Sequence, residues 1–374
     1  QSDDQVLEQQ RRLARFDATG FSRSNVQGMM NSLRWGLDHR IHGSASTTGA
    51  SLITDANPDA PPLELRGRDF AWDPIAGTIE PTAGGGQHGM DFDRWGQKFV
   101  CSNSDHLRFA RYEDRYLGRN PWFAAPAPTI SIAADGPQAD VYRSSPIEPW
   151  RIVRTRLRAT GVVPGLVEGG GRPAGYFTGA TGVTLYEPDP TSDELPWAIV
   201  ADVGSNLVHR KRLTRVGNSY VGERIDVQSE FVASTDIWFR PVQFAIGPDA
   251  ALYVIDMYRE VIEHPASLPE PIKKHLDLDS GRDRGRIWRV VPERFEQPPP
   301  PRLESASNEQ LVEALADRRI WWRRTATRLL IERRDPRAVP LLIVRWNAAD
   351  RTPLESLHLL SALDAYGALD ETIV

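Results

Sequence analysis

The sequence lacks the features that mark several large classes of protein. Cys101 is the only cysteine among 374 residues, which excludes an intramolecular disulfide and any CxxC metal or redox motif. No run approaches the roughly 20 apolar residues that cross a bilayer. The formal charge of −5 offers nothing to attract nucleic acid, so we expect no nucleic-acid partner. Because the chain begins at Gln1 rather than Met, we expect it to be a fragment, on which a leader or anchor cannot be judged.

Turn-forming and aromatic residues, by contrast, are plentiful. The chain contains 29 glycines, 29 prolines and 11 tryptophans. Many turns together with aromatic-rich strands favour repeated β-hairpins over a helical bundle. A hydrophobic fraction of 40% and a charged fraction of 25% are those of an ordinary globular domain.

The clearest pattern lies at 238–259, which reads WFRPVQFAIGPDAALYVIDMYR. Val242, Phe244 and Ile246 alternate with their neighbours, as in a strand with one apolar face. The residues at 247–249, Gly-Pro-Asp, suit a tight turn, and 252–255 resumes as a second strand. This segment predicts a β-hairpin.

The same hairpin pattern recurs along the chain, at 32–43 and 88–101, while 197–203 matches 251–257. Superposing the copies places Leu33, Met90 and Phe244 in register, and likewise Ile41, Lys98 and Leu252. Hairpins repeated at about 50 residues are typical of β-propeller blades. We therefore predict a mainly β, partial β-propeller over 1–297, with about four blades visible between 20 and 295 and with N-terminal blades missing.

The pattern changes after four consecutive prolines at 298–301, which predict a stiff linker over 298–305. Apolar residues then recur at helical spacing, with Asn308 as the expected N-cap of the first helix. Paired helices with Asp-Pro in the turn at 335–336 are typical of α-solenoid repeats. We predict HEAT-like helical repeats over 306–374, cut short by the end of the chain.

Several long runs resemble one family of large bacterial proteins. The runs are GQHGMDFDRWGQKFVCSNSDH, EPWRIVRTRLR, GYFTGATGVTLYE, VGSNLVHRKRL, FVASTDIWFRPVQFAIGPDAALYVIDMYREVIEHP and RGRIWRV. They resemble the PVC-type membrane-bound dehydrogenases, also described as haem-binding CxxCH proteins. The resemblance implies a six-bladed propeller similar to soluble quinoprotein glucose and sorbosone dehydrogenases, followed by HEAT repeats and a c-type cytochrome domain.

The resemblance also implies an activity. It implies oxidation of a sugar or another alcohol, a periplasmic or membrane-associated location, and electron transfer to haem c. This sequence contains no CxxCH, so the haem domain is expected outside it. Pyrroloquinoline quinone and calcium are the cofactors that the similarity to quinoproteins suggests for the propeller. In those enzymes the catalytic histidine precedes its strand by several residues, where this chain has Gly85 and Gly86.

The first residues of the innermost strands are expected to ring one mouth of the propeller axis. In this register they are Asn31, Gln87, His88, Asn206 and Arg240. His88 is the natural general base, and Arg240 would hold an anionic quinone or substrate across the channel. A structural role for His88, as a hydrogen-bonding residue between blades, is the alternative.

Other candidates have weaker signals. His209 follows Asn206 in GSNLVHRKR, and Tyr258 and Arg259 follow the best-formed strand, where loops often carry binding residues. Each could instead serve only packing. Asp277, Asp279 and Asp283 in DLDSGRD faintly resemble a calcium loop, although a surface turn is the simpler interpretation.

Two functions from different classes therefore remain open. One is a propeller oxidoreductase domain acting on a sugar or another alcohol and passing electrons to a cytochrome domain of the same protein. The other is a non-catalytic platform in which propeller and α-solenoid bind carbohydrate or protein. The fold alone cannot decide between them, because propellers perform both roles.

Overall fold

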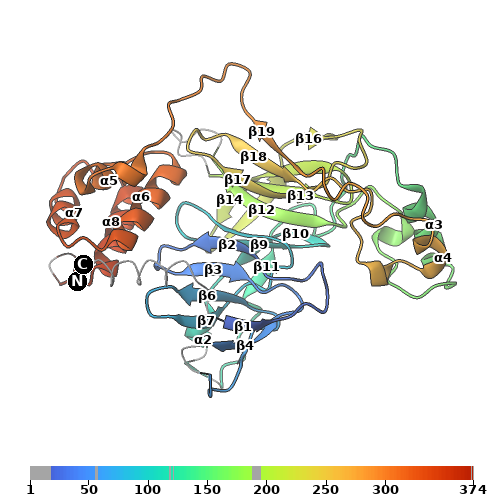
Figure 1. Ribbon diagram of the computed structural model, residues 1–374, viewed down its shortest axis with the longest axis horizontal. Helices are drawn as coiled ribbons and strands as arrows, with labels where there is room; N and C mark the ends of the chain where they lie inside the picture. Colours follow the sequence, from blue (N-terminus) through green and yellow to red (C-terminus); the bar gives the residue numbers. More distant parts are fainter. Residues whose placement is uncertain are drawn as a thin grey trace.

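The structure, a computed structural model, describes residues 18–54, 58–117, 119–120, 122–187, 195–371 and 373. It is mainly β, with antiparallel sheets followed by a helical C-terminal segment (Figure 1). Residues 1–17, the start of the predicted propeller region, lie outside the described residues. None of the helices in the described part of the chain combines the length and apolar character of a membrane span.

Four of the sheets begin with two antiparallel strands that are consecutive in the chain, and three of these pairs coincide with the hairpins predicted at 32–43, 88–101 and 238–259. The first is β2 (Asn31–Trp35), β3 (Ile41–Ser44), β6 (Asp69–Asp73) and β7 (Thr78–Thr82). The second is β8 (Met90–Phe92), β9 (Lys98–Ser102), β10 (Asp105–Ala110) and β11 (Thr129–Ser131). The third is β12 (Ala180–Tyr186), β13 (Trp197–Asp202), β14 (Leu207–Val216) and β15 (Ser219–Arg224), with β16 (Val232–Ala233) also on β14. The fourth is β17 (Pro241–Ile246), β18 (Leu252–Asp256) and β19 (Arg286–Val290). A smaller sheet pairs β4 (Ala50–Thr54) with β1 (Ala18–Phe21) and β5 (Leu63–Glu64).

The predicted register of the hairpins is confirmed. The last pairs before the three turns occupy equivalent positions: Trp35 with Ile41, Phe92 with Lys98 and Ile246 with Leu252. The match of 197–203 to 251–257 is confirmed too, since β13 and β18 are each the second strand of their sheets.

The first strands of these sheets lie next to one another, in the order β2, β8, β12, β17. Gly182 in β12 shows how closely they approach. A Cβ atom there would lie 2.8 Å from the carbonyl oxygen of Val242, and the residue has a φ of 69°. Only glycine meets both demands at low cost. The packing places the N-terminal ends of four strands around one region.

Apolar cores fill the spaces between successive sheets. The largest lies between the second and third sheets and includes Phe99, Phe109, Phe177 and Leu207. Another, around Ile199, Phe244 and Val254, joins the third sheet to the fourth. Cys101 is wholly buried, and burial raises the pKa of its thiol to about 12, so the thiol is protonated at pH 7.

Helices lie outside this arrangement of sheets. α3 (Pro149–Ala159) and the short α4 (Glu270–Lys273) pack together beside the third and fourth sheets (Figure 1). α2 (Asp114–Leu117) and the 3₁₀ turns Gly169–Gly171, Pro265–Ser267 and Leu303–Ser305 lie in connections. The sequence did not predict α3.

The C-terminal segment is helical, as the spacing of its apolar residues predicts. Its helices are α5 (Asn308–Ala314), α6 (Ile320–Arg333), α7 (Ala338–Trp346) and α8 (Pro353–Ala365), and they share one core. The predicted N-cap at Asn308 is wrong by one residue. Ser307 caps α5 by accepting from the backbone N–H of Gln310, whose side chain completes a capping box.

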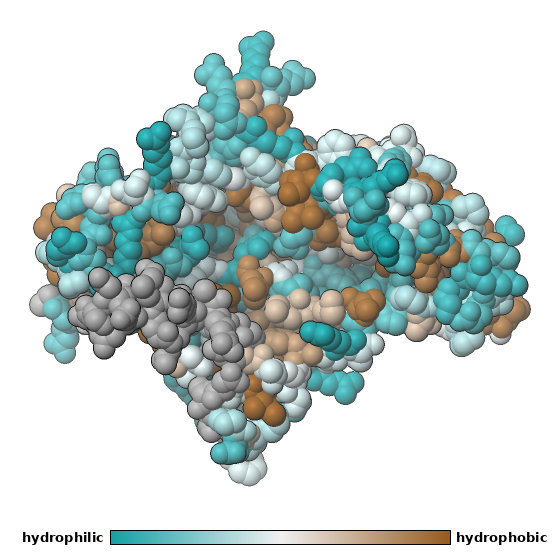
Figure 2. All heavy atoms as spheres, viewed as in Figure 1, coloured by the Kyte–Doolittle hydropathy of each residue, from teal (hydrophilic) through white to brown (hydrophobic). Residues whose placement is uncertain are grey.

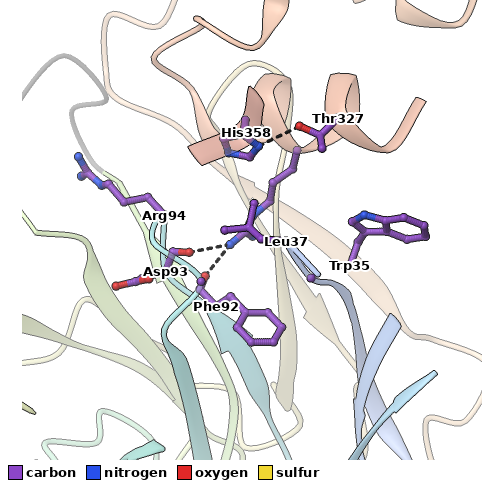
Figure 3. Close-up of a pocket in the computed structure, with 10 residues that line it drawn as sticks. Trp35, Leu37, Phe92, Asp93, Arg94, Thr327 and His358 are labelled. Atoms are coloured by element: carbon purple, nitrogen blue, oxygen red, sulfur yellow. Dashed lines mark hydrogen bonds between the residues drawn. The ribbon is translucent and has the colours of Figure 1, made fainter. Parts of the chain in front are cut away.

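This helical segment contacts the hairpin turns of three sheets. Arg324 of α6 donates to the carbonyl oxygens of Phe92 at 2.7 Å and Asp93 at 3.1 Å. The indole N–H of Trp322 donates to Pro248 at 2.9 Å, and the Ser361 hydroxyl donates to Leu37 at 2.7 Å. A narrow pocket of about 20 Å³ remains between the turns and the helices. Figure 3 shows it, with the hydrogen bond between Thr327 and His358. That volume holds little more than water.

Candidate functional site

A larger cavity lies at the end of the sheets where their first strands begin, away from the turns that meet α6. Its volume is about 250 Å³. Loops from all four sheets contribute to its wall: Val26, Gln27, His88, Asn103, Arg151, Thr178, Gly179, Thr181, Val203, Gly204, Val242, Met257, Ile262 and Glu263. The wall therefore combines apolar side chains with a few polar groups, as small-molecule sites do.

One hydrogen bond joins the loops of the first and fourth sheets beside the cavity. The Gln27 side-chain amide donates to the carbonyl oxygen of Ile262 at 2.8 Å, although the two residues are 235 positions apart. Figure 2 shows the surface hollowed between the first and fourth sheets, with apolar side chains on both rims. The cavity is thus bounded by residues distant in sequence but fixed to each other.

The backbone of His88 is fixed by two hydrogen bonds from β12. Its carbonyl oxygen accepts from the Gly182 N–H at 2.7 Å and from the Thr181 hydroxyl at 3.0 Å. Burial lowers the pKa of the imidazole to about 4, only partly offset by a hydrogen bond with Asn103. The ring is therefore neutral at pH 7 and able to accept a proton or a hydrogen bond.

Arg151 and Glu263 bring charge to the wall. Pro149 at the start of α3 and the inward-facing Trp150, which packs against Val261, fix the helix so that Arg151 faces the cavity. The Arg151 side chain is only 3% exposed and lies 3.5 Å from Glu148 and 3.7 Å from Glu263. Among the described residues its Nε and Nη2 atoms have no hydrogen-bond partner. Glu263 instead pairs with Arg154 at 3.0 Å.

Asp202 positions two of the lining loops. Its carboxylate accepts from the backbone N–H of Thr178 at 3.1 Å and of Gly204 at 2.9 Å. Complete burial raises its pKa to about 6, and Arg151 nearby acts in the opposite direction. The residue holds the loops in place and does not itself line the cavity.

Three of the predicted mouth residues lie together. The Asn31 side chain donates to the carbonyl oxygen of Gln87 at 3.0 Å, and the Gln87 side chain accepts from the Asn103 N–H at 3.3 Å. His88 follows directly and lines the cavity, whereas Asn31 and Gln87 do not. Their role is to fix the loop that carries His88.

The expectation that Arg240 faces His88 across a channel is wrong. Arg240 is wholly buried and does not line the cavity. Each of its guanidinium nitrogens already donates: Nε to Arg259, Nη1 to Val203, and Nη2 to Glu148 and Glu260. Arg240 therefore joins segments inside the protein, because the loop after β18 folds over it and its carbonyl oxygens accept hydrogen bonds from the guanidinium.

Asn206 belongs to the same interior region and not to the mouth. Its side-chain amide donates to the carbonyl oxygens of Ile237 at 3.0 Å and Phe239 at 2.7 Å, and its oxygen accepts from the Ser145 hydroxyl. Its φ of 60° suits asparagine at a tight turn.

The remaining predicted binding residues are also engaged elsewhere. His209 is buried against Glu230, 2.6 Å away, and packs on Phe177. The Tyr258 ring lies under the guanidinium of Arg286 at 3.7 Å, and the Arg259 carbonyl oxygen accepts from Arg240. None of His209, Tyr258 and Arg259 lines the cavity.

The calcium interpretation is not supported. Asp277, Asp279 and Asp283 are exposed. Among the described residues, no three His, Cys, Asp or Glu side chains are grouped so that they could hold a metal ion. This segment is a surface turn, with Asp277 accepting from the Asp279 N–H at 3.0 Å.

Pyrroloquinoline quinone does not fit the cavity either. The quinone carries several carboxylates, which require several cationic partners. In the described wall Arg151 is the single cationic side chain, and Glu263 lies beside it. The donor set instead suits a ligand with hydroxyl groups and at most one negative charge.

Several residues of the cavity were not predicted from the sequence: Gln27, Asn103, Arg151, Thr178, Thr181 and Gly204. A signal existed for Arg151. EPWRIVRTRLR places arginines three and four residues apart after a proline, which is compatible with a helix that carries one cationic face. The threonines and Gly204 gave no signal, because their role depends on the packing of strands distant in sequence.

The fold and site together define a mainly β protein with a mixed polar and apolar cavity at the meeting point of four antiparallel sheets. The family model for a domain of unknown function, DUF7133, matches residues 1–294, and the chain belongs to this family. Neither the curated proteins nor the solved structures contain a significant match.

Proposed function

We propose that the four sheets are blades of a β-propeller whose ring is completed by blades of a longer protein, with HEAT-like repeats after it. The adjacent first strands and the equivalent hairpin registers support this arrangement. The paired helices α5–α6 and α7–α8 support the second part.

We further propose that the cavity binds a sugar or another polyol as the substrate site of an oxidoreductase. The observation that carries this proposal is a neutral, partly buried imidazole, His88, in a wall that also offers hydroxyl, amide and ionic partners. Apolar faces of Val203, Val242 and Ile262 would pack against the carbon skeleton of the ligand.

The chemistry assigned to this chain is the proton step. His88 would accept the proton of the substrate hydroxyl, while Asn103 orients the imidazole. Oxidation also removes a hydride from the same carbon, and no protein side chain accepts a hydride. The hydride acceptor is therefore a separate two-electron redox group bound next to the substrate. Haem c of the cytochrome domain that the family resemblance implies, in a periplasmic or membrane-associated protein, would then take the electrons from that group one at a time.

A non-catalytic platform that binds carbohydrate or protein is the second candidate. The observation that favours it is the internal position of Arg240, which leaves the cavity with one cationic side chain and an arrangement sufficient for binding alone.

One experiment separates the two. Binding of a panel of sugars and polyols would be measured by calorimetry, and turnover of each binder would be followed with an artificial electron acceptor. Binding with turnover supports the oxidoreductase, and binding without turnover supports the platform. If no polyol binds, both proposals for the cavity fail, and the protein-binding form of the platform is left.

A further inference from the structure

Arg151 places a buried guanidinium in the wall of the cavity. Burying a cation is costly unless hydrogen bonds replace its water. Yet Nε and Nη2 of this side chain have no hydrogen-bond partner among the described residues, and the side chain is 3% exposed. A Cβ atom on Gly204 would lie 3.2 Å from Nη1 and 3.3 Å from Nη2, so the guanidinium packs close to Gly204, and both residues line the cavity.

Nearby carboxylates do not satisfy it, because they serve other arginines better. Glu148 bonds to Arg240 at 3.0 Å and lies 3.4 Å from Arg143, against 3.5 Å for Arg151. Glu263 pairs with Arg154 at 3.0 Å and is 3.7 Å from Arg151.

The third carboxyl group near Arg151 gives its oxygens to the backbone instead. Asp202 accepts from Thr178 and Gly204. The nearby carboxylates thus balance the charge of Arg151, but among the described residues none accepts a hydrogen bond from its Nε or Nη2 atom.

On the side of Arg151 and Thr178, the cavity adjoins a smaller polar pocket. That pocket has a volume of about 20 Å³, and its wall includes Arg151, Arg154, Arg158 and Thr178. Nε of Arg154 and of Arg158 also has no hydrogen-bond partner within the described part of the chain. Glu168 is the one carboxylate on the described wall of this pocket. Three guanidinium groups from successive turns of α3 therefore line this pocket, and each has an Nε atom without a hydrogen-bond partner in the described part of the chain.

We infer that Arg151 binds the carboxylate of an acidic sugar, so that the ligand of the cavity is a sugar acid. This inference rests on the proposed polyol site and adds its charge and orientation. The carboxylate lies on Arg151 at the α3 side, and the hydroxyl groups reach His88, Asn103 and Thr181 on the opposite wall. One negative charge suits a site in which Glu263 would repel a second.

The test compares a sugar acid with its neutral parent. Calorimetry would measure glucuronate and glucose with the native chain, and we expect glucuronate to bind about 10 to 100 times more tightly, the range of one charge-assisted hydrogen-bonding pair. Arg151→Gln should remove this preference and leave glucose binding within about threefold. Arg156→Gln is the matched control, because it removes an exposed arginine from the same helix.

Further variants keep the result interpretable if Arg151→Gln folds poorly. Arg151→Lys retains the charge and should keep part of the preference. Glu263→Gln removes the neighbouring negative charge and should tighten glucuronate but not glucose, which a purely structural role would not produce.

The outcomes separate this inference from the proposed function. If glucose and glucuronate bind equally, the polyol site stands and the carboxylate subsite is refuted. If Arg156→Gln weakens glucuronate as much as Arg151→Gln, the subsite is also refuted. Tighter binding of glucose 6-phosphate than of glucuronate would replace the carboxylate by phosphate and overturn the assignment. If neither sugar binds, the proposed site and the inference fail together.

Discussion

The guanidinium of Arg240 and the carboxylate of Glu148 lie 3.0 Å apart, and both side chains are shielded from solvent. Arg240 precedes β17, and Glu148 precedes α3. The pair therefore joins the fourth sheet to the helix that carries Arg151. Burial lowers the pKa of Arg240, and the adjacent Glu148 opposes this effect, so the guanidinium remains charged.

Arg240→Ala should therefore lower stability before it affects ligand binding. Removing one partner of a buried ion pair leaves the other uncompensated, and we expect a loss of about 3 to 5 kcal/mol in the free energy of unfolding. Urea denaturation would measure it, with Arg259→Ala as the control, because that side chain is partly exposed. A variant of native stability with weakened ligand binding would contradict the structural role.

His88→Gln should lower turnover about 100-fold or more and leave polyol binding intact, because glutamine keeps hydrogen bonding but cannot act as the base. Since the pKa of His88 is about 4, native activity limited by this base should stay level from pH 8 to near 5 and fall below. Steady-state rates across that pH range check both statements. His275→Gln, at an exposed histidine, is the control. Unchanged turnover in His88→Gln would favour the non-catalytic platform.

Acid should destabilise the fold through its buried histidines. Burial lowers the pKa of His88 to about 4 and of His106 and His358 to about 3, and it holds the pKa of His209 well below 6.5. The unfolded chain takes up these protons near pH 6.5 and the folded chain does not. Stability is therefore full above pH 6.5 and declines as the pH falls toward 4. Asp202, whose pKa is raised to about 6, offsets part of the decline.

Each uncompensated histidine contributes a slope of about 1.4 kcal/mol per pH unit in that window. Calorimetric unfolding at pH 7, 6 and 5 should show the decline, and His358→Gln should reduce its steepness while His275→Gln does not. Equal slopes in the native chain and His358→Gln would show that His358 is protonated in the folded state as well.

Arg324→Ala should loosen the helical segment from the sheets. Arg324 donates two hydrogen bonds to carbonyl oxygens of the turn after β8, and its loss leaves those oxygens unsatisfied. Limited proteolysis within 292–302 should become several-fold faster, because cleavage there follows the population of the open form. Arg328→Ala on the same helix, at an exposed position, should match the native chain. Equal cleavage rates for both variants would mean that Arg324 does not hold the segment.

The hairpins and the C-terminal helices could be predicted because their signals are local. Alternation on both sides of Gly247-Pro248-Asp249 determines a hairpin without reference to the rest of the chain. α3 shows the opposite case. Its inward face carries Arg151 and Arg154, whose burial depends on Glu263, a residue more than 100 positions away. A charged helical face indicates a solvent-facing surface in sequence alone, and only tertiary packing turns it inward.

The prediction that Arg240 faces the cavity was wrong for a related reason. A polar residue at the start of an innermost strand was expected to face the axis, but the loop after β18 covers it. His88 was predicted from the register of the repeated hairpins, which is a local signal. In the structure it lines the cavity, and its carbonyl oxygen accepts from Gly182 and Thr181 of β12.

The helical segment contacts turns of the first, second and fourth sheets at once. These turns must keep fixed lengths, since an inserted residue in any of them would displace α6 or α8. The loops around the cavity lie at the other end of the sheets, and α6 and α8 do not constrain their lengths. Across the family we therefore expect insertions and ligand-specific changes to accumulate at the cavity end, while the turns under α6 and α8 vary little. The same helix-bound end of the sheets would then support different ligand preferences at the opposite end.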